Sequence, residues 1–170
     1  MDVLVLMGSD SDYEVMQHAV PFYRQFGLDL RMTVASAHRT PARVEAEVAK
    51  AEAEGAFAIV CAAGMAAHLA GVVAGITNLP VIGVPLASGA LDGLDALLAT
   101  VQMPAGIPVA TVGIGKSGAR NAAILCARMV GPHRPAVAQA LVDYRGGMSA
   151  KIAAAADKVE ARVAADWAGA

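Results

Sequence analysis

A length of 170 residues suits one domain of ordinary size. The formal net charge is −2 and no basic block occurs, which argues against a nucleic-acid-binding protein. Only 16% of the residues are charged, against about 25% in typical soluble domains, and this scarcity predicts that other subunits cover part of the surface.

Predicted strands and helices alternate along the chain. Five runs of β-branched and aliphatic residues are typical of strands buried on both faces, at residues 3–6, 30–35, 57–63, 80–85 and 107–114. Apolar residues at helical spacing predict helices at 16–26, 41–51, 65–76, 91–101, 121–130, 136–144 and 148–167. The alternation predicts an α/β fold whose parallel sheet is covered on both faces. Since we find no linker or repeat, we expect a single domain over residues 1–170, with its core at about 3–145 and a helical tail at about 146–170.

Residues 55–91 contain no Asp, Glu, Lys or Arg, which raises the question of a membrane span. A spanning helix needs about 20 consecutive apolar residues, whereas glycines, prolines and Asn78 divide this stretch into short elements. We therefore interpret it as a buried strand, a helix and a second buried strand. The helix predicted at 65–76 is apolar around its whole circumference, which predicts that another subunit covers it.

The chain is organised around residues 36–41, which follow the second predicted strand and lead into a helix. Thr40 is a suitable N-cap, and Pro41 suits the first helical turn, where its missing N–H has no partner to lose. His38 and Arg39 therefore stand at the carboxyl end of a strand, where open α/β sheets bind ligands. We interpret His38 as the proton-transfer residue and Arg39 as an anion clamp. For the pair taken alone, a polar surface pair beside a helix cap remains the alternative.

Residues 8–12, with the sequence Gly-Ser-Asp-Ser-Asp, join the first strand to a helix N-terminus. The hydroxyls of Ser9 and Ser11 and the free backbone N–H groups there suit a phosphate, although ordinary helix capping explains the same residues. Asp12 would repel a phosphate, so in a ligand site it would accept hydrogen bonds from sugar hydroxyls. The segment matches neither a Walker loop nor a dinucleotide-binding glycine turn.

Other residues give weaker indications. Cys61 and Cys126 lie in apolar surroundings and are expected to be buried free thiols in a reducing compartment. His68 taken alone, inside an apolar helix, indicates a core residue. No spacing of His, Cys, Asp or Glu resembles a metal site, and the Gly-x-Ser-x-Gly motif of hydrolases is absent. Asp2 and residues 8–10 interrupt any apolar leader segment, and we expect a cytoplasmic protein.

Five motifs occur in a fixed order along the chain. They are Gly-Ser-Asp-Ser-Asp at 8–12, Ser-Ala-His-Arg-Thr-Pro at 36–41, Ala-Ala-His-Leu at 66–69, Gln-Met-Pro-Ala-Gly-Ile-Pro-Val at 102–109, and Ile-Gly-Lys through Asn-Ala-Ala at 114–123. Together they resemble the N5-carboxyaminoimidazole ribonucleotide mutase family of purine biosynthesis, over about residues 3–144. The resemblance implies a three-layer α/β/α sandwich with a parallel, flavodoxin-like or Rossmann-like central sheet. It also implies a homo-octamer whose active sites are shared between neighbouring subunits.

The resemblance assigns roles to individual residues. It implies that His38 is the catalytic acid and base and that Ser9, Asp12 and Arg39 bind the substrate. The loop at 63–69 would line the place where a carboxylate or CO2 is held. The predicted substrate-binding set is completed by other residues of these segments, namely Ser11, Ser36, Ala37, Gly64, Met65, Ala67, His68 and Leu69.

The family contains two subclasses. One moves a carboxylate from an exocyclic nitrogen to ring carbon C4, and the other carboxylates the aminoimidazole directly with CO2. The Ala-Ala-His-Leu loop at 66–69 is similar to the first, although Met65 and Ala70 stand where glycine and proline are common. We predict the mutase reaction. The direct carboxylase is the alternative on the same scaffold, and a non-catalytic phosphosugar-binding module is the alternative from another class.

The predicted reaction needs only the substrate and these side chains. A carbamate-like group that enters the uncharged loop at 64–67 loses its hydration, which favours release of CO2. Carbon C4 then attacks the CO2, and His38 carries the proton, since an imidazole ordinarily changes its charge near neutral pH. We expect no cofactor, metal, nucleic acid or membrane to take part. The expected partners are a phosphoribosyl aminoimidazole and further copies of this chain.

Overall fold

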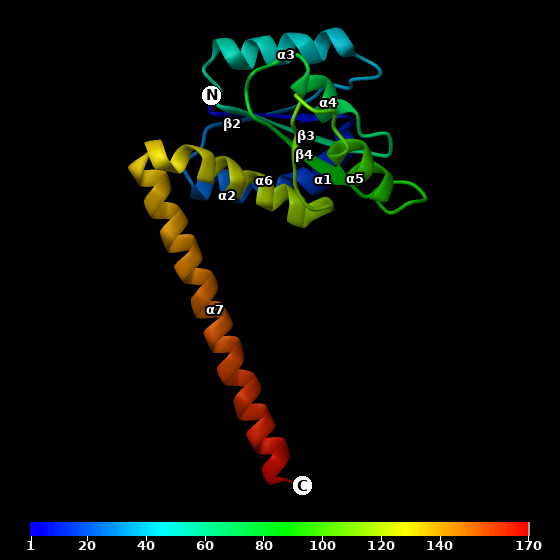
Figure 1. Ribbon diagram of the computed structural model, residues 1–170. Coiled ribbons are helices and arrows are strands. Elements are labelled where there is room, and N and C mark those ends of the chain that lie inside the picture. Colours follow the sequence, from blue (N-terminus) through cyan, green and yellow to red (C-terminus); the bar gives the residue numbers. More distant parts are fainter. Residues whose placement is uncertain (170) are drawn as a thin grey trace.

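The computed structural model describes residues 1–169 and contains one parallel sheet of five strands. The strand order is β2-β1-β3-β4-β5, with β1 at Val3–Met7, β2 at Leu30–Val34, β3 at Ala58–Gly64, β4 at Val81–Leu86 and β5 at Ala110–Thr111. Helices cover both faces of the sheet (Figure 1). The α/β fold with three layers and a flavodoxin-like strand order is therefore confirmed.

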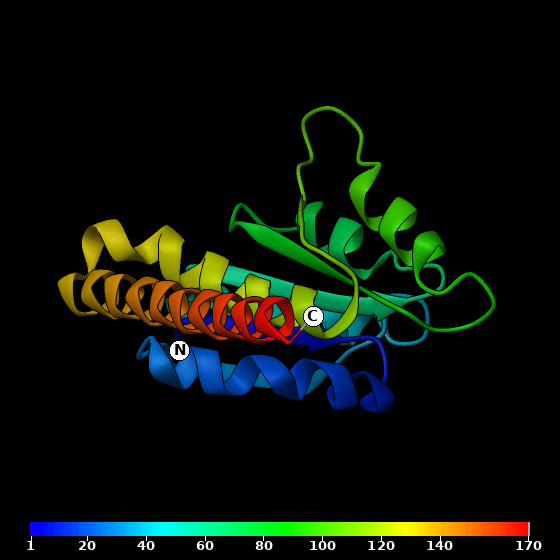
Figure 2. The same cartoon turned by 90° about the horizontal axis from the view of Figure 1, so that it is seen from below.

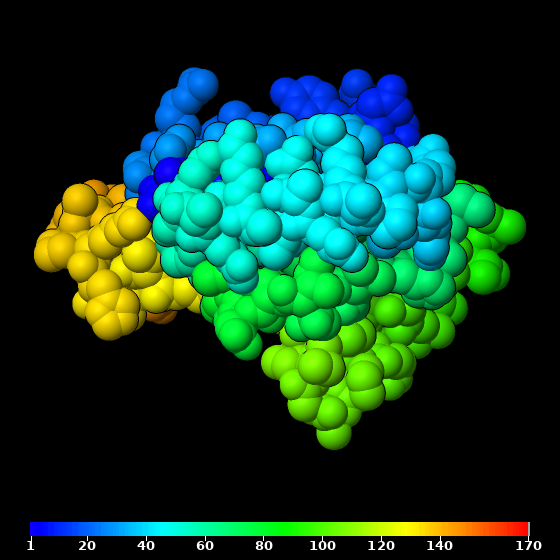
Figure 3. Space-filling view, turned by 90° about the horizontal axis from the view of Figure 1, so that it is seen from above, coloured from blue at the N-terminus to red at the C-terminus, as the bar shows by residue number. Residues whose placement is uncertain are grey.

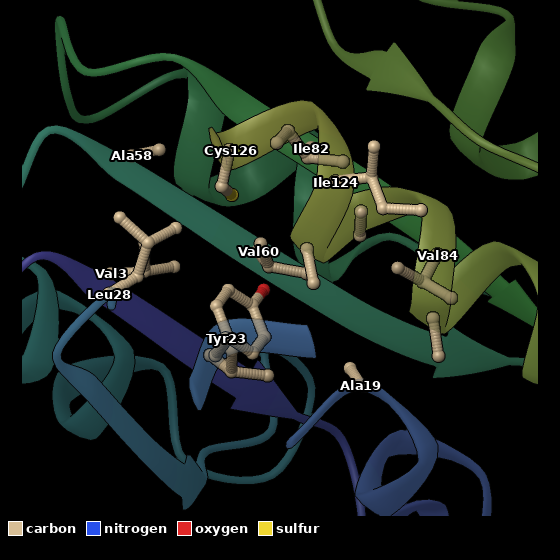
Figure 4. Packing of buried hydrophobic residues seen from close by; sticks show 14 of the residues in the cluster. Val3, Ala19, Tyr23, Leu28, Ala58, Val60, Ile82, Val84, Ile124 and Cys126 are labelled. Atoms are coloured by element: carbon tan, nitrogen blue, oxygen red, sulfur yellow. The ribbon is translucent and has the colours of Figure 1, made fainter. Parts of the chain in front are cut away.

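Alternate residues of β1 are buried on opposite faces of the sheet. Val3 and Val5 face a core formed with α1 (Tyr13–Met16), α2 (Val20–Gln25) and α6 (Gly115–Val130). Figure 4 shows part of this core, to which Tyr23 of α2, Val60 of β3 and Cys126 of α6 all belong. Every residue of β1 is buried, as expected for a strand of a parallel sheet with helices on both sides.

The second face is covered by α3 (Pro41–Ala53), α4 (Leu69–Ala74) and α5 (Leu94–Val101). In Figure 3 α3 lies across this face in cyan, with α4 beside it in green. Gly83 of β4 lies beneath both α4 and α5, because a Cβ there would stand 2.3 Å from Thr100 and 3.5 Å from Ala70. The glycine thus lets two helices approach the sheet closely.

The first predicted helix is divided. In place of one helix ending at Phe26, the chain forms a 3₁₀ turn at Asp10–Asp12, then α1, a second 3₁₀ turn at Gln17–Ala19, and α2. Pro21 explains the second interruption, since it has no N–H to donate to the carbonyl four residues earlier.

Two further predicted boundaries near the sheet were wrong. The strand expected at 107–114 is reduced to the two residues of β5, in a segment where Pro108 removes one backbone donor. The helix expected at 65–76 is reduced to α4, and the residues before it form a turn in which Met65 has a positive φ of 55°. Val72, in the helical part of this segment, is exposed in the single chain, so the cover by another subunit stays a prediction.

The C-terminal part forms one helix rather than two. After α6, which begins six residues earlier than expected, and a 3₁₀ turn at Gly131–His133, α7 runs from Pro135 to Ala168 over 34 residues. Figures 1 and 2 show it leaving the body of the protein as a single rod. Gly146 and Gly147 lie within it without interrupting it. Over residues 1–169, no helix is both long enough and apolar enough to span a membrane.

Candidate functional site

Four turns meet at the carboxyl edge of the sheet and enclose a cavity of about 490 Å³. They follow β1, β2, β3 and β4, and the order β2-β1-β3 places the turn after β1 between the other two. This is the crevice where flavodoxin-like sheets bind ligands. The lining residues are Gly8, Ser9, Ser11, Asp12, Ser36, Ala37, His38, Arg39, Ala63, Gly64, Met65, Ala66, Leu69 and Ser88.

The turn after β1 is held by its own side chains. Asp12 Oδ2 accepts a hydrogen bond from the backbone N–H of Ser9 at 2.9 Å, and Ser9 Oγ accepts one from the N–H of Ser11 at 3.4 Å. Ser9 and Asp12 form a capping box on the short 3₁₀ turn, so the interpretation of these two residues as helix caps is confirmed. Burial of Asp12 raises the pKa of its carboxyl above the usual value, although the N–H of Ser9 opposes this effect.

The turn after β2 brings Arg39 to the end of β1. Its Nη2 donates a hydrogen bond to the carbonyl of Gly8 at 2.6 Å, and its Nε donates one to Ser36 Oγ at 3.4 Å. Thr40 occupies the N-cap position of α3 and Pro41 its first residue, as predicted. The Thr40 hydroxyl, however, accepts from the N–H of Ser36 and does not cap the helix. The hydrogen bond between Thr40 and Ser36 therefore closes the turn that carries His38 and Arg39.

His38 and His68 form a pair across the site. Nε2 of His38 lies 3.0 Å from Nδ1 of His68, and the two rings are nearly perpendicular, at an interplanar angle of 82°. One ring must donate and the other accept, because a hydrogen bond between two imidazoles contains a single proton. The interpretation of His68 as a core residue was wrong, since its side chain is exposed and contacts the predicted proton-transfer residue.

The wall formed after β3 carries no charged side chain. Gly64, Met65, Ala66 and Leu69 line the cavity there, and Met65 is 58% exposed. Of the predicted substrate-binding residues, Ala67 and His68 are not among the lining residues; Ala67 is buried behind the wall.

Sequence reasoning missed Ser88, which lines the cavity from the turn after β4. The sequence offered an indication of this position. Ser88 follows a predicted buried strand, and in a parallel sheet the carboxyl end of that strand lies at the same edge as the ends of the others.

The two cysteines take no part in this site. Both are buried and free, as predicted. Burial raises the pKa of the Cys126 thiol to about 12 and that of Cys61 further still, so neither supplies a thiolate near neutral pH. Among residues 1–169, no three His, Cys, Asp or Glu side chains are grouped closely enough to hold a metal ion.

Comparisons with known proteins identify the family of the chain. The AIR carboxylase family matches residues 2–151. The N5-carboxyaminoimidazole ribonucleotide mutase of Thermotoga maritima is 46% identical over 156 residues, which cover 92% of this chain and 90% of that protein. The protein of the same name from Pyrococcus horikoshii is 47% identical over 156 residues, which cover 92% of this chain and 87% of that protein.

A solved structure has the same fold. The crystal structure of Treponema denticola PurE superposes with a TM-score of 0.83 at 28% sequence identity, covering 92% of this chain and 96% of that chain. The match of the family over most of the chain, together with relatives of this similarity, shows that the chain belongs to the AIR carboxylase family.

Proposed function

We propose that this protein is an enzyme of purine biosynthesis, an N5-carboxyaminoimidazole ribonucleotide mutase. The reaction moves a carboxylate from the exocyclic nitrogen of the substrate to ring carbon C4. The observation that carries the proposal is a single cavity with an arginine and two serines at one end, an uncharged wall at the other, and His38 among its lining residues.

The polar end suits the phosphoribosyl group. Arg39 has five N–H donors, and its two named bonds to Gly8 and Ser36 use two of them, which leaves three for a phosphate. The hydroxyls of Ser9 and Ser11 lie 3.0 Å apart and can turn toward the same anion. Asp12 accepts hydrogen bonds from ribose hydroxyls, since a carboxylate is an acceptor only.

The uncharged end suits the group that moves. A carboxylate on nitrogen is well hydrated in water, and contact with Gly64, Ala66 and Leu69 replaces that water without supplying a charge. Loss of hydration favours cleavage of the carbon–nitrogen bond, because its product, CO2, is neutral. The enclosed CO2 then stays close to carbon C4.

His38 completes a closed proton cycle. In its charged form it gives a proton to the exocyclic nitrogen as the carbon–nitrogen bond breaks, and it becomes neutral. Carbon C4 attacks CO2, and the neutral imidazole then removes the proton from C4 and regains its charge. The hydrogen bond between His38 and His68 fixes the ring during both transfers.

The test compares two substrate mixtures. We expect the purified protein to form the C4-carboxylated product from N5-carboxyaminoimidazole ribonucleotide, and much more slowly from aminoimidazole ribonucleotide with bicarbonate. Faster product formation from the second mixture would assign the direct carboxylase instead. Tight binding without turnover in either mixture would assign a non-catalytic phosphosugar-binding module.

A variant tests the role of His38. In His38→Asn we expect kcat to fall by about 10²- to 10⁴-fold, with KM and thermal stability close to those of the unaltered protein, because the exposed ring contributes little to packing. A kcat near that of the unaltered protein would remove His38 from the mechanism.

We also propose that the enzyme is a homo-octamer. An apolar stripe on α5 is left for another subunit, because Leu94, Leu98 and Val101 recur three and four residues apart and each remains exposed. Leu91, in the turn before α5, is exposed as well. Light scattering after gel filtration should give a mass eight times that of the 17.2 kDa chain. Its two buried free thiols suit the reducing cytoplasm, where we place the enzyme.

A further inference from the structure

Ser88 lies against the turn after β3, which contributes no polar side chain to the cavity lining. It belongs to the segment between β4 and α5 and lines the cavity together with Gly64, Met65 and Ala66. Its side chain is exposed, so its hydroxyl is open to a ligand.

Gly64 is the reason that the hydroxyl can occupy this place. A Cβ at residue 64 would lie 1.9 Å from Oγ of Ser88, 3.1 Å from Cβ of Ser88 and 3.3 Å from the carbonyl oxygen of Leu86. Any side chain at residue 64 would therefore displace the hydroxyl. The two turns meet again where Met65 packs against Gly89, since a Cβ on that glycine would stand 3.7 Å from Met65.

The two ends of the cavity differ in what they can donate. At the end near β1, side-chain donors come from Arg39, Ser9 and Ser11. The turn after β3 contributes only alanine, methionine, leucine and glycine to the lining, and Ser88 supplies a hydroxyl beside it. A substrate with a phosphate at the first end would bring its carboxylate to the second.

We infer that Ser88 contacts the substrate and that its hydroxyl donates a hydrogen bond to the migrating carboxylate. The inference rests on the proposed function and assigns one contact within it. A carboxylate oxygen is a much better hydrogen-bond acceptor than an oxygen of CO2, so this contact stabilises the two carboxylated states relative to the intermediate that contains CO2. Ser88 thereby holds the carboxylate in place before the first bond breaks and after the second forms.

The experiment compares two ligands that differ only in the carboxylate. Binding of the C4-carboxylated product and of aminoimidazole ribonucleotide is measured by calorimetry for the unaltered protein, Ser88→Ala and Ser88→Thr. We expect Ser88→Ala to weaken binding of the carboxylated ligand by about 3- to 10-fold and to leave binding of the other ligand unchanged. Ser88→Thr keeps a hydroxyl and should recover most of the affinity.

A second variant tests the geometry. Gly64→Ala displaces the hydroxyl without removing it, so it should produce the same selective loss, and the double variant Gly64→Ala/Ser88→Ala should lose no more than the larger single loss. Equal weakening of both ligands in Ser88→Ala, or no weakening of either, would overturn the inference. If the unaltered protein turned over neither substrate mixture, the proposed function would fail instead, and the two failures are thus distinguishable.

Discussion

Arg39 offers the sharpest test of the site because a second arginine on the same segment serves as its control. Arg39 donates to the carbonyl of Gly8 and to Ser36, whereas Arg43, one helical turn later, donates to the carbonyl of Val34 at 2.8 Å and pairs with Glu47. Both residues are exposed cations near the start of α3. Only Arg39 lines the cavity described above.

The expected loss follows from the donors that remain free on Arg39. A hydrogen bond from a charged donor is worth roughly 1.5–3 kcal/mol, and each 1.4 kcal/mol corresponds to about a tenfold change in affinity. Because Arg39 is exposed and solvent screens its charge, we take the lower half of that range. Arg39→Ala should therefore raise KM for N5-carboxyaminoimidazole ribonucleotide by about 10- to 40-fold, and Arg39→Lys should give an intermediate value, since lysine keeps the charge without the planar fork.

The assay measures KM and kcat at low and at high salt, together with the urea midpoint of unfolding. Affinity of the unaltered protein should fall as salt rises, and Arg39→Ala should show a weaker dependence. Arg43→Ala should lower the urea midpoint, because Glu47 loses a partner, and should leave KM unchanged. An unchanged KM in Arg39→Ala, or an equal rise in both variants, would refute the assignment of Arg39 as the phosphate-binding residue.

Two other predictions concern stability. The raised pKa of Asp12 means that the folded protein holds this proton more tightly than the unfolded chain, so stability is greatest below the usual carboxyl value of 3.8 and falls as pH rises, until the folded carboxyl has also ionised. Asp12→Asn should therefore raise the urea midpoint at pH 7 relative to the unaltered protein while lowering kcat/KM, and a lower midpoint at pH 7 would contradict this account. Gly83→Ala should cost about 1–3 kcal/mol of unfolding free energy, because its Cβ would lie 2.3 Å from the buried Thr100, whereas Gly113→Ala, whose Cβ meets nothing within 4 Å, serves as the control. Similar urea midpoints for these two glycine variants would contradict this prediction, because they would show that α5 shifts to accommodate the added methyl group without a loss of stability.

The sequence predicted the strands better than the helices for a physical reason. Three of the five strands, β1, β3 and β4, are fully or largely buried, so their composition is set by the two layers of helices around them. The helix ends depend on single residues. Pro21 divides the first helix, whereas Gly146 and Gly147 do not divide α7, since a glycine in a helix costs only about 1 kcal/mol relative to alanine.

The pairing of His38 with His68 could not be predicted from local pattern. The two residues are 30 positions apart in the sequence, and they meet because β1 lies between β2 and β3 and brings the turns after those strands to one crevice. Periodicity of apolar residues placed His68 in a helix, but that helix begins only at Leu69. The strand before Ser88 could have placed this residue at the crevice, but its contact with Gly64 of β3 could not be predicted from local pattern.

The short β5 leaves part of the outer edge of β4 without a neighbouring strand. It pairs with β4 only at Ile82 and Gly83, so the outer edge of β4 from Val84 to Leu86 has no neighbouring strand among residues 1–169. Gly83 accepts from Val112 on that outer side, and because hydrogen-bonding direction alternates along a strand, Pro85 also faces outward. This edge thus lacks an N–H where an incoming β-strand of another molecule would need one, and its residues are buried, so both features protect the protein against fibril-like association.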